Sequence, residues 1–159
     1  MGMKIGRKVR MDHVEVSWPN QIEIGDESII EHNVYFKYDG SWKSNRSIII
    51  KNNVFIGNNC EFNIKESVTI GNNCLIGAGS RFVDHDHGIN LSDPIRKQYC
   101  PRKSIELKED VWVGANCLIL KGVKIDTGAI VAGGSVVTKS IPAFEIWAGI
   151  PAKKIGYRK

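Results

Sequence analysis

The chain has 159 residues, of which 42% are hydrophobic and 25% are charged, and its formal net charge is +5 at pH 7. This composition is ordinary for a globular protein, and no apolar run approaches the roughly 18 residues that a membrane-spanning helix needs. The first residues also lack the charged and then apolar pattern of a secretory signal peptide, so we expect a single cytoplasmic domain without membrane insertion.

The excess positive charge gathers near the two ends of the chain. The basic residues there are Lys4, Arg7, Lys8 and Arg10, and then Lys153, Lys154, Arg158 and Lys159. Such a cluster either keeps a surface solvated or attracts phosphate groups, which could belong to nucleic acid, a nucleotide cofactor or a sugar nucleotide. Charge alone favours the solvated surface.

Large apolar residues recur every six positions after an N-terminal segment, residues 1–21. The series are Ile50, Ile56 and Phe62, then Ile70, Ile76 and Phe82, and finally Leu107, Val113, Ile119, Ile125, Val131 and Val137. A second inward position lies two residues earlier, and glycine or asparagine often follows the large residue, as in IGNN at 56–59 and 70–73. Such alternation is typical of a short strand, and Gly and Asn tolerate the left-handed backbone of a corner. Repetition of strand and corner predicts a parallel β-helix over residues 22–140.

The repeat also explains three of the cysteines. Cys60, Cys74 and Cys117 occupy the smaller inward position, where a free cysteine packs as a compact apolar residue. No CxxC pair exists, so we expect neither a thiolate zinc site nor a catalytic or disulfide role for these three.

Three interruptions of the period predict loops. The first covers Tyr38 to Arg46, and the second is a two-residue excess near Lys65–Glu66. The longest, residues 84–103, must leave the β-helix as an arm. Trp42 and Arg46 of the first loop are candidates for an acceptor pocket, because aromatic faces pack against sugar rings.

The root of the arm carries the stretch FVDHDHGIN, in which His85 and His87 lie between acidic residues. The pair could bind a metal ion, exchange protons with a substrate, or belong to a solvated turn. Taken alone, the stretch favours the solvated turn, so the rest of the chain has to decide.

The repeat ends after Val137. Pro142 and Pro151 are poor continuations of the coils. The apolar residues Ile141, Phe144, Ile146 and Trp147 predict a packed cap over residues 141–159, which a solenoid needs at its end.

The hexapeptide units, the run VWVGANCLILKGVKI and above all AGGSVVTKSIPAFEIWAGIPAKKI resemble the hexapeptide-repeat acetyltransferases, in particular the maltose and galactoside O-acetyltransferase branch and its relatives in polysaccharide biosynthesis. The resemblance covers approximately residues 48–155. It implies an all-β, left-handed parallel β-helix with an excursion arm and a short C-terminal cap. It also implies a homotrimer with acetyl-CoA bound between neighbouring subunits and the arm reaching over the adjacent one.

The resemblance places the general base of the transfer in the arm. Histidine suits this role because its pKa lies near neutral pH. His87, which Gly88 follows, is the better match to the family, and His85 is the alternative. Asp84 or Asp86 could orient the ring.

The resemblance also implies a set of acetyl-CoA contacts. Trp112, Gly114 and Ala115 lie where the family stabilises the oxyanion with backbone N–H groups. Gly133, Thr138 and Lys139 line the pantetheine slot, and Lys153 contacts the nucleotide end. Gly156 stands where the family has a second basic residue, and Lys154 or Arg158 could take over the role of that residue.

The resulting hypothesis is an enzyme that moves an acetyl group from acetyl-CoA to a hydroxyl of a sugar or glycan precursor, with no metal ion and no nucleic-acid partner. Three alternatives stay open. The first is N-acetylation of an amino-sugar nucleotide, and the second is a zinc hydrolyase of the γ-carbonic anhydrase type, which needs three converging histidines. The third is a non-catalytic scaffold.

Overall fold

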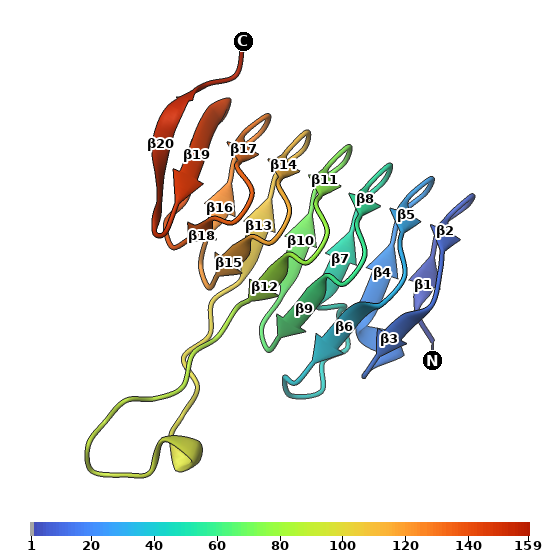
Figure 1. Ribbon diagram of the computed structural model, residues 1–159. Helices are drawn as coiled ribbons and strands as arrows, with labels where there is room; N and C mark the ends of the chain where they lie inside the picture. The colour runs from blue at the N-terminus through green and yellow to red at the C-terminus, as the bar shows by residue number, and fades with distance from the viewer. Residues whose placement is uncertain (1) are drawn as a thin grey trace.

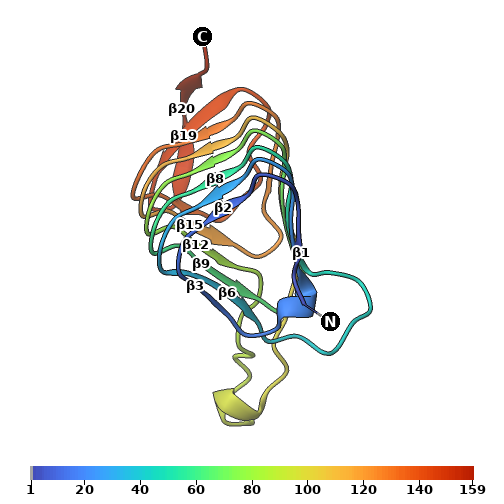
Figure 2. The same ribbon diagram turned by 90° about the vertical axis from the view of Figure 1, so that its right-hand side faces the viewer.

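The computed structural model describes residues 2–159. The chain winds into a stack of coils, and each coil contributes one short strand to each of three parallel sheets, which we name A, B and C. Figure 1 shows the stack from the side, and Figure 2 looks along it, so that the three-sided section is visible.

The strands of the three sheets follow one another in every coil. Sheet A contains β1 (Lys4–Ile5), β4 (Ile22–Ile24), β7 (Ile48–Ile50), β10 (Val68–Ile70), β13 (Ile105–Leu107) and β16 (Lys124–Ile125). Sheet B contains β2 (Arg10–Met11), β5 (Ile29–Ile30), β8 (Phe55–Ile56), β11 (Leu75–Ile76), β14 (Trp112–Val113), β17 (Ile130–Val131), β19 (Glu145–Gly149) and β20 (Ala152–Tyr157). Sheet C contains β3 (Val14–Val16), β6 (Val34–Tyr38), β9 (Glu61–Ile64), β12 (Arg81–Val83), β15 (Leu118–Leu120) and β18 (Val136–Val137). Two short 3-10 helices, η1 (Pro19–Gln21) and η2 (Ile95–Lys97), lie in connections.

The core confirms the period of six. Equivalent residues pair directly across coils, for example Ile50 with Ile70 and Ile70 with Leu107. Phe62 stacks between Phe36 and Phe82, with ring centroids 5.1 and 4.7 Å apart. All of the large inward residues predicted from the repeat are buried. The predicted all-β, left-handed parallel β-helix is therefore confirmed.

The asparagines of the repeat make the corners. Asn59 and Asn73, the last residues of the two IGNN motifs, have φ values of 57° and 59°. Asn pays a smaller penalty than most residues for this left-handed conformation, which is why it recurs where the chain turns from one sheet to the next.

The coils begin earlier than residue 22, where the sequence analysis started them. Strands β1, β2 and β3 pair in parallel with β4, β5 and β6, so residues 4–16 form a first coil. Its inward residues include Ile5, Met11 and Val16, and the last spacing falls from six to five. A single short coil with one irregular spacing carries too little periodicity to be recognised.

The C-terminal residues close the other end of the stack as an antiparallel hairpin. Strand β19 continues sheet B beside β17, and β20 pairs with β19 from the outside. Ile141 is fully buried, whereas Phe144 is 51% exposed. None of the helices in residues 2–159 has the length and apolar character that crossing a bilayer requires.

Burial of the cysteines predicts a selective thiol reaction. Burial raises the pKa of Cys60 and of Cys74 to about 11, and it also raises the pKa of Cys117. At pH 8 these thiols stay protonated, and only a thiolate is nucleophilic. We expect iodoacetamide at pH 8 to label Cys100, which is partly exposed, and to leave the other three intact.

Mass spectrometry of tryptic peptides measures this labelling directly. Denatured protein is the control, in which all four thiols should react. Labelling of Cys60 or Cys74 in the native protein, at a rate similar to that of Cys100, would contradict the packing described above.

Candidate active site

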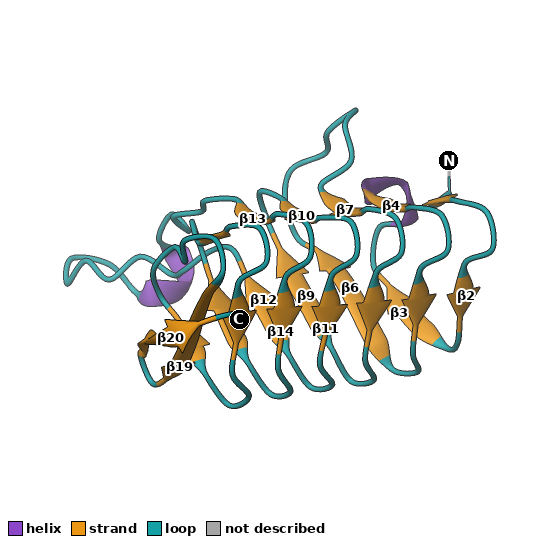
Figure 3. Ribbon diagram, turned by 90° about the horizontal axis from the view of Figure 1, so that it is seen from above, coloured by secondary structure: helices purple, strands orange, loops and turns teal. Residues whose placement is uncertain are grey.

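The three interruptions of the repeat lie on one corner of the β-helix. The chain leaves sheet C after β6, after β9 and after β12, and returns to sheet A at β7, β10 and β13. The connections are residues 39–47, which we call the early loop, the short turn 65–67, and the arm, residues 84–104. Because they belong to successive coils, they are stacked beside one another, and both long ones project from the helix (Figures 2 and 3). The predicted arm is thus confirmed.

Asp84 fastens the root of the arm to the turn of the coil before it. The residue is fully buried, and its carboxylate accepts three backbone N–H hydrogen bonds, from Lys65 at 2.8 Å, Glu66 at 2.7 Å and Ser67 at 2.9 Å. A buried carboxylate requires this number of donors, because each unpaired lone pair would lose its solvation. The two-residue excess at Lys65–Glu66 creates the turn that supplies these donors.

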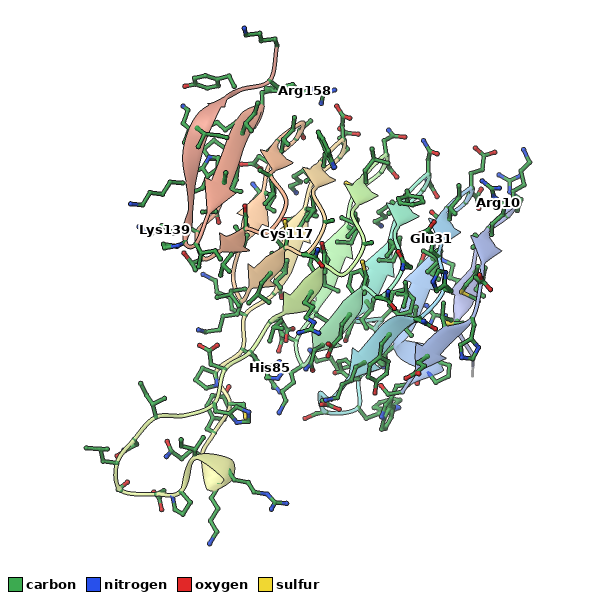
Figure 4. The ribbon with its side chains drawn as sticks, in the orientation of Figure 1. Arg10, Glu31, His85, Cys117, Lys139 and Arg158 are labelled. Carbon is green, nitrogen blue, oxygen red and sulfur yellow. The ribbon has the colours of Figure 1, made fainter. Side chains whose placement is uncertain are left out.

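The same carboxylate contacts the first histidine. Nδ1 of His85 lies 3.2 Å from Oδ1 of Asp84, and the His85 side chain is only 10% exposed. An isolated antiparallel β-bridge between His85 and Arg102 joins the outgoing and returning segments of the arm at its root. When Nδ1–H donates to a carboxylate, Nε2 carries the free lone pair and can accept a proton. Figure 4 places His85 where the arm leaves the coils.

His87 has different surroundings. It is exposed, and its Nδ1 lies 3.8 Å from Sγ of Cys100. The carboxylate between the two histidines, Asp86, contacts Nζ of Lys121 on the next coil rather than a ring. Both histidines, Asp86 and Lys121 line one open pocket together with apolar residues of the arm. Within residues 2–159, no three His, Cys, Asp or Glu side chains converge as metal ligands would.

One polar group on sheet C, one coil before the strand that leads into the arm, was missed by the sequence analysis. Oδ1 of Asn63 is the one side-chain N or O atom of residues 2–159 that is buried without a hydrogen-bond partner. Asn63 pairs in register with Val83 across β9 and β12, and the alternation of strands puts its side chain on the outer face, as for His85 two residues beyond Val83. Its position just before the Lys65–Glu66 excess was the available signal.

The predicted oxyanion residues gather at a different corner, between sheets B and C. A Cβ atom on Gly114 would lie 2.5 Å from the backbone N of Gly133, so glycine is required for the coils to stack there. Ala115 accepts a hydrogen bond from Gly134 N–H at 2.8 Å, and its own N–H donates to no acceptor within residues 2–159. Trp112 points outward from β14 and is 52% exposed.

The structure does not bring this corner to the histidines of the same chain. Ala115 precedes β15, whereas His85 follows β12, and these two strands are paired neighbours of sheet C. Ala115 and His85 therefore lie at opposite ends of that sheet. Thr138 and Lys139 follow β18 and lie on the corner of the histidines, two coils further along the stack.

The basic residues near the C-terminus divide into two kinds. Lys154 pairs with Glu145 at 2.7 Å, and Arg158 pairs with Asp110 at 2.6 Å. Lys139 and Lys153 are exposed and have no ion pair within residues 2–159. The latter two are free to meet an anion, while the residues expected to substitute for Gly156 already have carboxylate partners.

Comparisons of sequence agree with this architecture. Residues 104–139 match the family described as bacterial transferase hexapeptide (six repeats), and residues 47–91 match the hexapeptide repeat of succinyl-transferase. The chain is 51% identical over 49 residues to 2,3,4,5-tetrahydropyridine-2,6-dicarboxylate N-acetyltransferase of Staphylococcus aureus. That match covers 31% of this chain and 20% of the length of the relative.

Solved structures share the whole fold. AntD, an N-acyltransferase from Bacillus cereus in complex with dTDP and 3-hydroxybutyryl-CoA, has a TM-score of 0.80 at 22% identity, over 99% of this chain and 85% of that one. A hexapeptide-repeat-containing acetyltransferase from Vibrio cholerae, complexed with acetyl-CoA, has a TM-score of 0.66 at 25% identity, over 97% of this chain and 70% of that one.

The contacts of Asp84 predict how much this residue contributes to the free energy of unfolding. Asp84→Asn should lower the free energy of unfolding by about 1.5–3 kcal/mol, because the neutral amide turns an NH₂ group toward backbone donors that the carboxylate now accepts. Asp86→Asn is the matched control and should cost less than about 1 kcal/mol, since the Asp86 side chain is 50% exposed. Urea unfolding followed by circular dichroism measures both values. Equal effects of the two substitutions would show that the Asp84 contacts do not hold the arm.

Proposed function

We propose that this chain, which belongs to the hexapeptide-repeat transferases, moves an acetyl group from acetyl-CoA to a hydroxyl of a sugar or glycan precursor. The observation that carries the proposal is the contact between the Asp84 carboxylate and the His85 ring at the root of the arm, and we assign to the pair the roles of orienting group and general base. The family repeats, the N-acetyltransferase similarity and the CoA compounds bound in the two similar structures support the acyl-transfer chemistry. No metal ion is needed for this reaction.

The base acts on the acceptor. Nε2 of His85 takes the proton of the acceptor hydroxyl while the oxygen attacks the thioester carbonyl. Asp84 keeps the proton on Nδ1 and stabilises the imidazolium that forms. When the tetrahedral intermediate collapses, the C–S bond breaks, and the imidazolium returns the proton to the leaving thiolate of CoA.

Two further groups have complementary tasks in the proposed reaction. The free N–H of Ala115 donates to the oxyanion of the intermediate, as a backbone group that is already in place. The unpartnered Oδ1 of Asn63 accepts a hydrogen bond from the acceptor. The exposed and unpaired Lys139 and Lys153 meet the phosphates of CoA, whose pantetheine arm runs past Gly133 and Thr138.

This arrangement requires more than one copy of the chain. Ala115 and His85 lie at opposite ends of sheet C, so one chain cannot offer both to the same acetyl group. Because the family resemblance implies a homotrimer, we place the site between two of its subunits, with the Ala115 corner and Trp112 of one subunit facing the arm root of the next.

A second candidate is transfer to an amine. Two of the three similar proteins named above are N-acyltransferases, and one of these two was solved with a nucleotide, dTDP. Matched acceptors that differ only in a hydroxyl or an amine at one carbon, such as glucose and glucosamine, separate the two reactions by mass spectrometry of the product. If the product carries the acetyl group on nitrogen alone, the proposed O-transfer is wrong and the reaction is N-transfer.

The remaining alternatives make different predictions. A zinc hydrolyase would carry about one tightly bound zinc ion per chain in elemental analysis. A scaffold would release no thiol from acetyl-CoA with any acceptor.

The identity of the base is tested by replacing each histidine. The sequence favoured His87, and the contact with Asp84 favours His85, so the two variants have opposite expectations. His85→Ala should lower kcat about 10²–10⁴-fold and leave the binding of CoA unchanged. His87→Ala is the control and should lose much less. Release of free thiol measures kcat, and a large loss in His87→Ala with little loss in His85→Ala would return the base to His87.

A further inference from the structure

The three connections on the corner of the arm are joined by their charged side chains. Nζ of Lys43, in the early loop, lies 2.8 Å from Oε1 of Glu66 in the short turn. Nε of Arg102, at the root of the arm, lies 3.0 Å from Oε2 of the same carboxylate. The row Lys43–Glu66–Arg102 therefore runs across three successive coils. It ends beside His85, because Arg102 and His85 form an antiparallel β-bridge.

The early loop is also fixed on its other side. The amide of Gln21 donates to the carbonyl of Lys43 at 2.8 Å, and Nη1 of Arg46 donates to the carbonyl of Asn20 at 2.8 Å. These bonds hold the loop against the connection of the first coil, residues 17–21.

Two large aromatic side chains remain open on these fixed loops. Trp42 of the early loop is 68% exposed, and Trp18 of the first connection is 41% exposed. An exposed indole ring on a held backbone offers a ligand an apolar face that is already in place, so little conformational freedom is lost on binding.

We propose that this corner binds a chain of sugar units, so that the acceptor is an oligosaccharide whose reacting unit lies at His85 and whose further units lie on the row Lys43–Glu66–Arg102 and on Trp42 and Trp18. We call this surface the acceptor shelf. The inference rests on the proposed function, and it adds the size and class of the acceptor.

The spacing of the coils agrees with this path. Neighbouring coils of a parallel β-helix are about 4.8 Å apart, so Trp42 and Trp18 belong to levels about 10 and 14 Å from that of His85. Two to three linked hexose rings cover such a distance.

The chemistry of the shelf also suits sugars. The C–H faces of a hexose pack on an indole ring, and its hydroxyls exchange hydrogen bonds with charged side chains, which form the stronger ones. The hydrogen bond from Lys43, with the charges of Lys43 and Arg102, keeps the pKa of Glu66 below its usual value against the opposing effect of burial. The carboxylate is therefore ionised near neutral pH and accepts from sugar hydroxyls.

The charges favour a neutral ligand over a sugar nucleotide on this surface. Lys43 and Arg102 share the carboxylate of Glu66, and Arg46 lies 3.6 Å from that of Glu23. A diphosphate would have to compete with these carboxylates, whereas an uncharged sugar chain leaves the ion pairs intact.

The first test measures turnover against acceptor length. The probes are two series of one to four units, glucose to maltotetraose and N-acetylglucosamine to chitotetraose, assayed by thiol release from acetyl-CoA. We expect kcat/KM to rise at least tenfold from one unit to three in one of the series. Trp42→Ala should abolish this rise, because the sugar units beyond the first lose their contact with the indole ring.

Tyr157→Ala is the matched control, because Tyr157 is an aromatic residue with 62% exposure on β20, at the far end of the stack. It should keep the dependence on length. A kcat/KM value that does not depend on length in either series would overturn the shelf, as would a Trp42→Ala variant that loses the same factor for one unit and for three.

The second test needs no catalysis. Titration of the intact protein with chitotetraose and maltotetraose should quench tryptophan fluorescence, and Trp42→Phe should remove most of the change. UDP-N-acetylglucosamine is the competing probe. If it quenches Trp42 at lower concentration than either tetrasaccharide, the shelf binds a nucleotide, and the proposal is wrong.

The two tests separate the two proposals. Binding of a tetrasaccharide at Trp42 without thiol release from any acceptor would support the acceptor shelf and contradict the proposed transferase function. Thiol release that is independent of acceptor length, without quenching at Trp42, would support the transferase function and contradict the acceptor shelf.

Discussion

Register between coils is the constraint on which the rest of the structure depends. Each coil must place its inward side chains directly over those of the coil before, as Ile50, Ile70 and Leu107 do in sheet A. An inserted residue within a strand would turn an inward side chain outward, so additional residues can leave only at a corner. The arm is the largest example, and it leaves without disturbing the pairing of β12 with β9 and β15 on its two sides.

The loops that this constraint expels are not independent of one another. Asp84, at the root of the arm, accepts hydrogen bonds from the turn at 65–67. Glu66 of that turn forms ion pairs with Lys43 of the early loop and with Arg102 of the arm. A polar cluster of this kind costs desolvation, and its members contribute little unless each is satisfied. Here the cluster turns flexible connections into a fixed surface around His85, which a base and a binding surface both require.

Part of the candidate site was readable before the structure was known. The arm, its position after Phe82 and its pair of histidines follow from the break in the period. The contacts that distinguish His85 from His87 do not, because the N–H donors to Asp84 come from a different coil, 17 to 19 residues earlier in the chain. Asn63 was missed for the same reason. Its oxygen is buried without a partner because of the neighbouring strands, and the residue type alone does not indicate this.

The sequence by itself determined the class of fold, the inward positions, the corners and the place of the arm, because a repeated unit stacks on copies of itself and its period reports its geometry. The structure alone decided three other matters. It began the stack with a first coil at residues 4–16, ended it with the hairpin β19–β20, and brought the early loop, the turn at 65–67 and the arm to one corner. Those are contacts between residues that differ in type and lie far apart in the chain, and no local period encodes them.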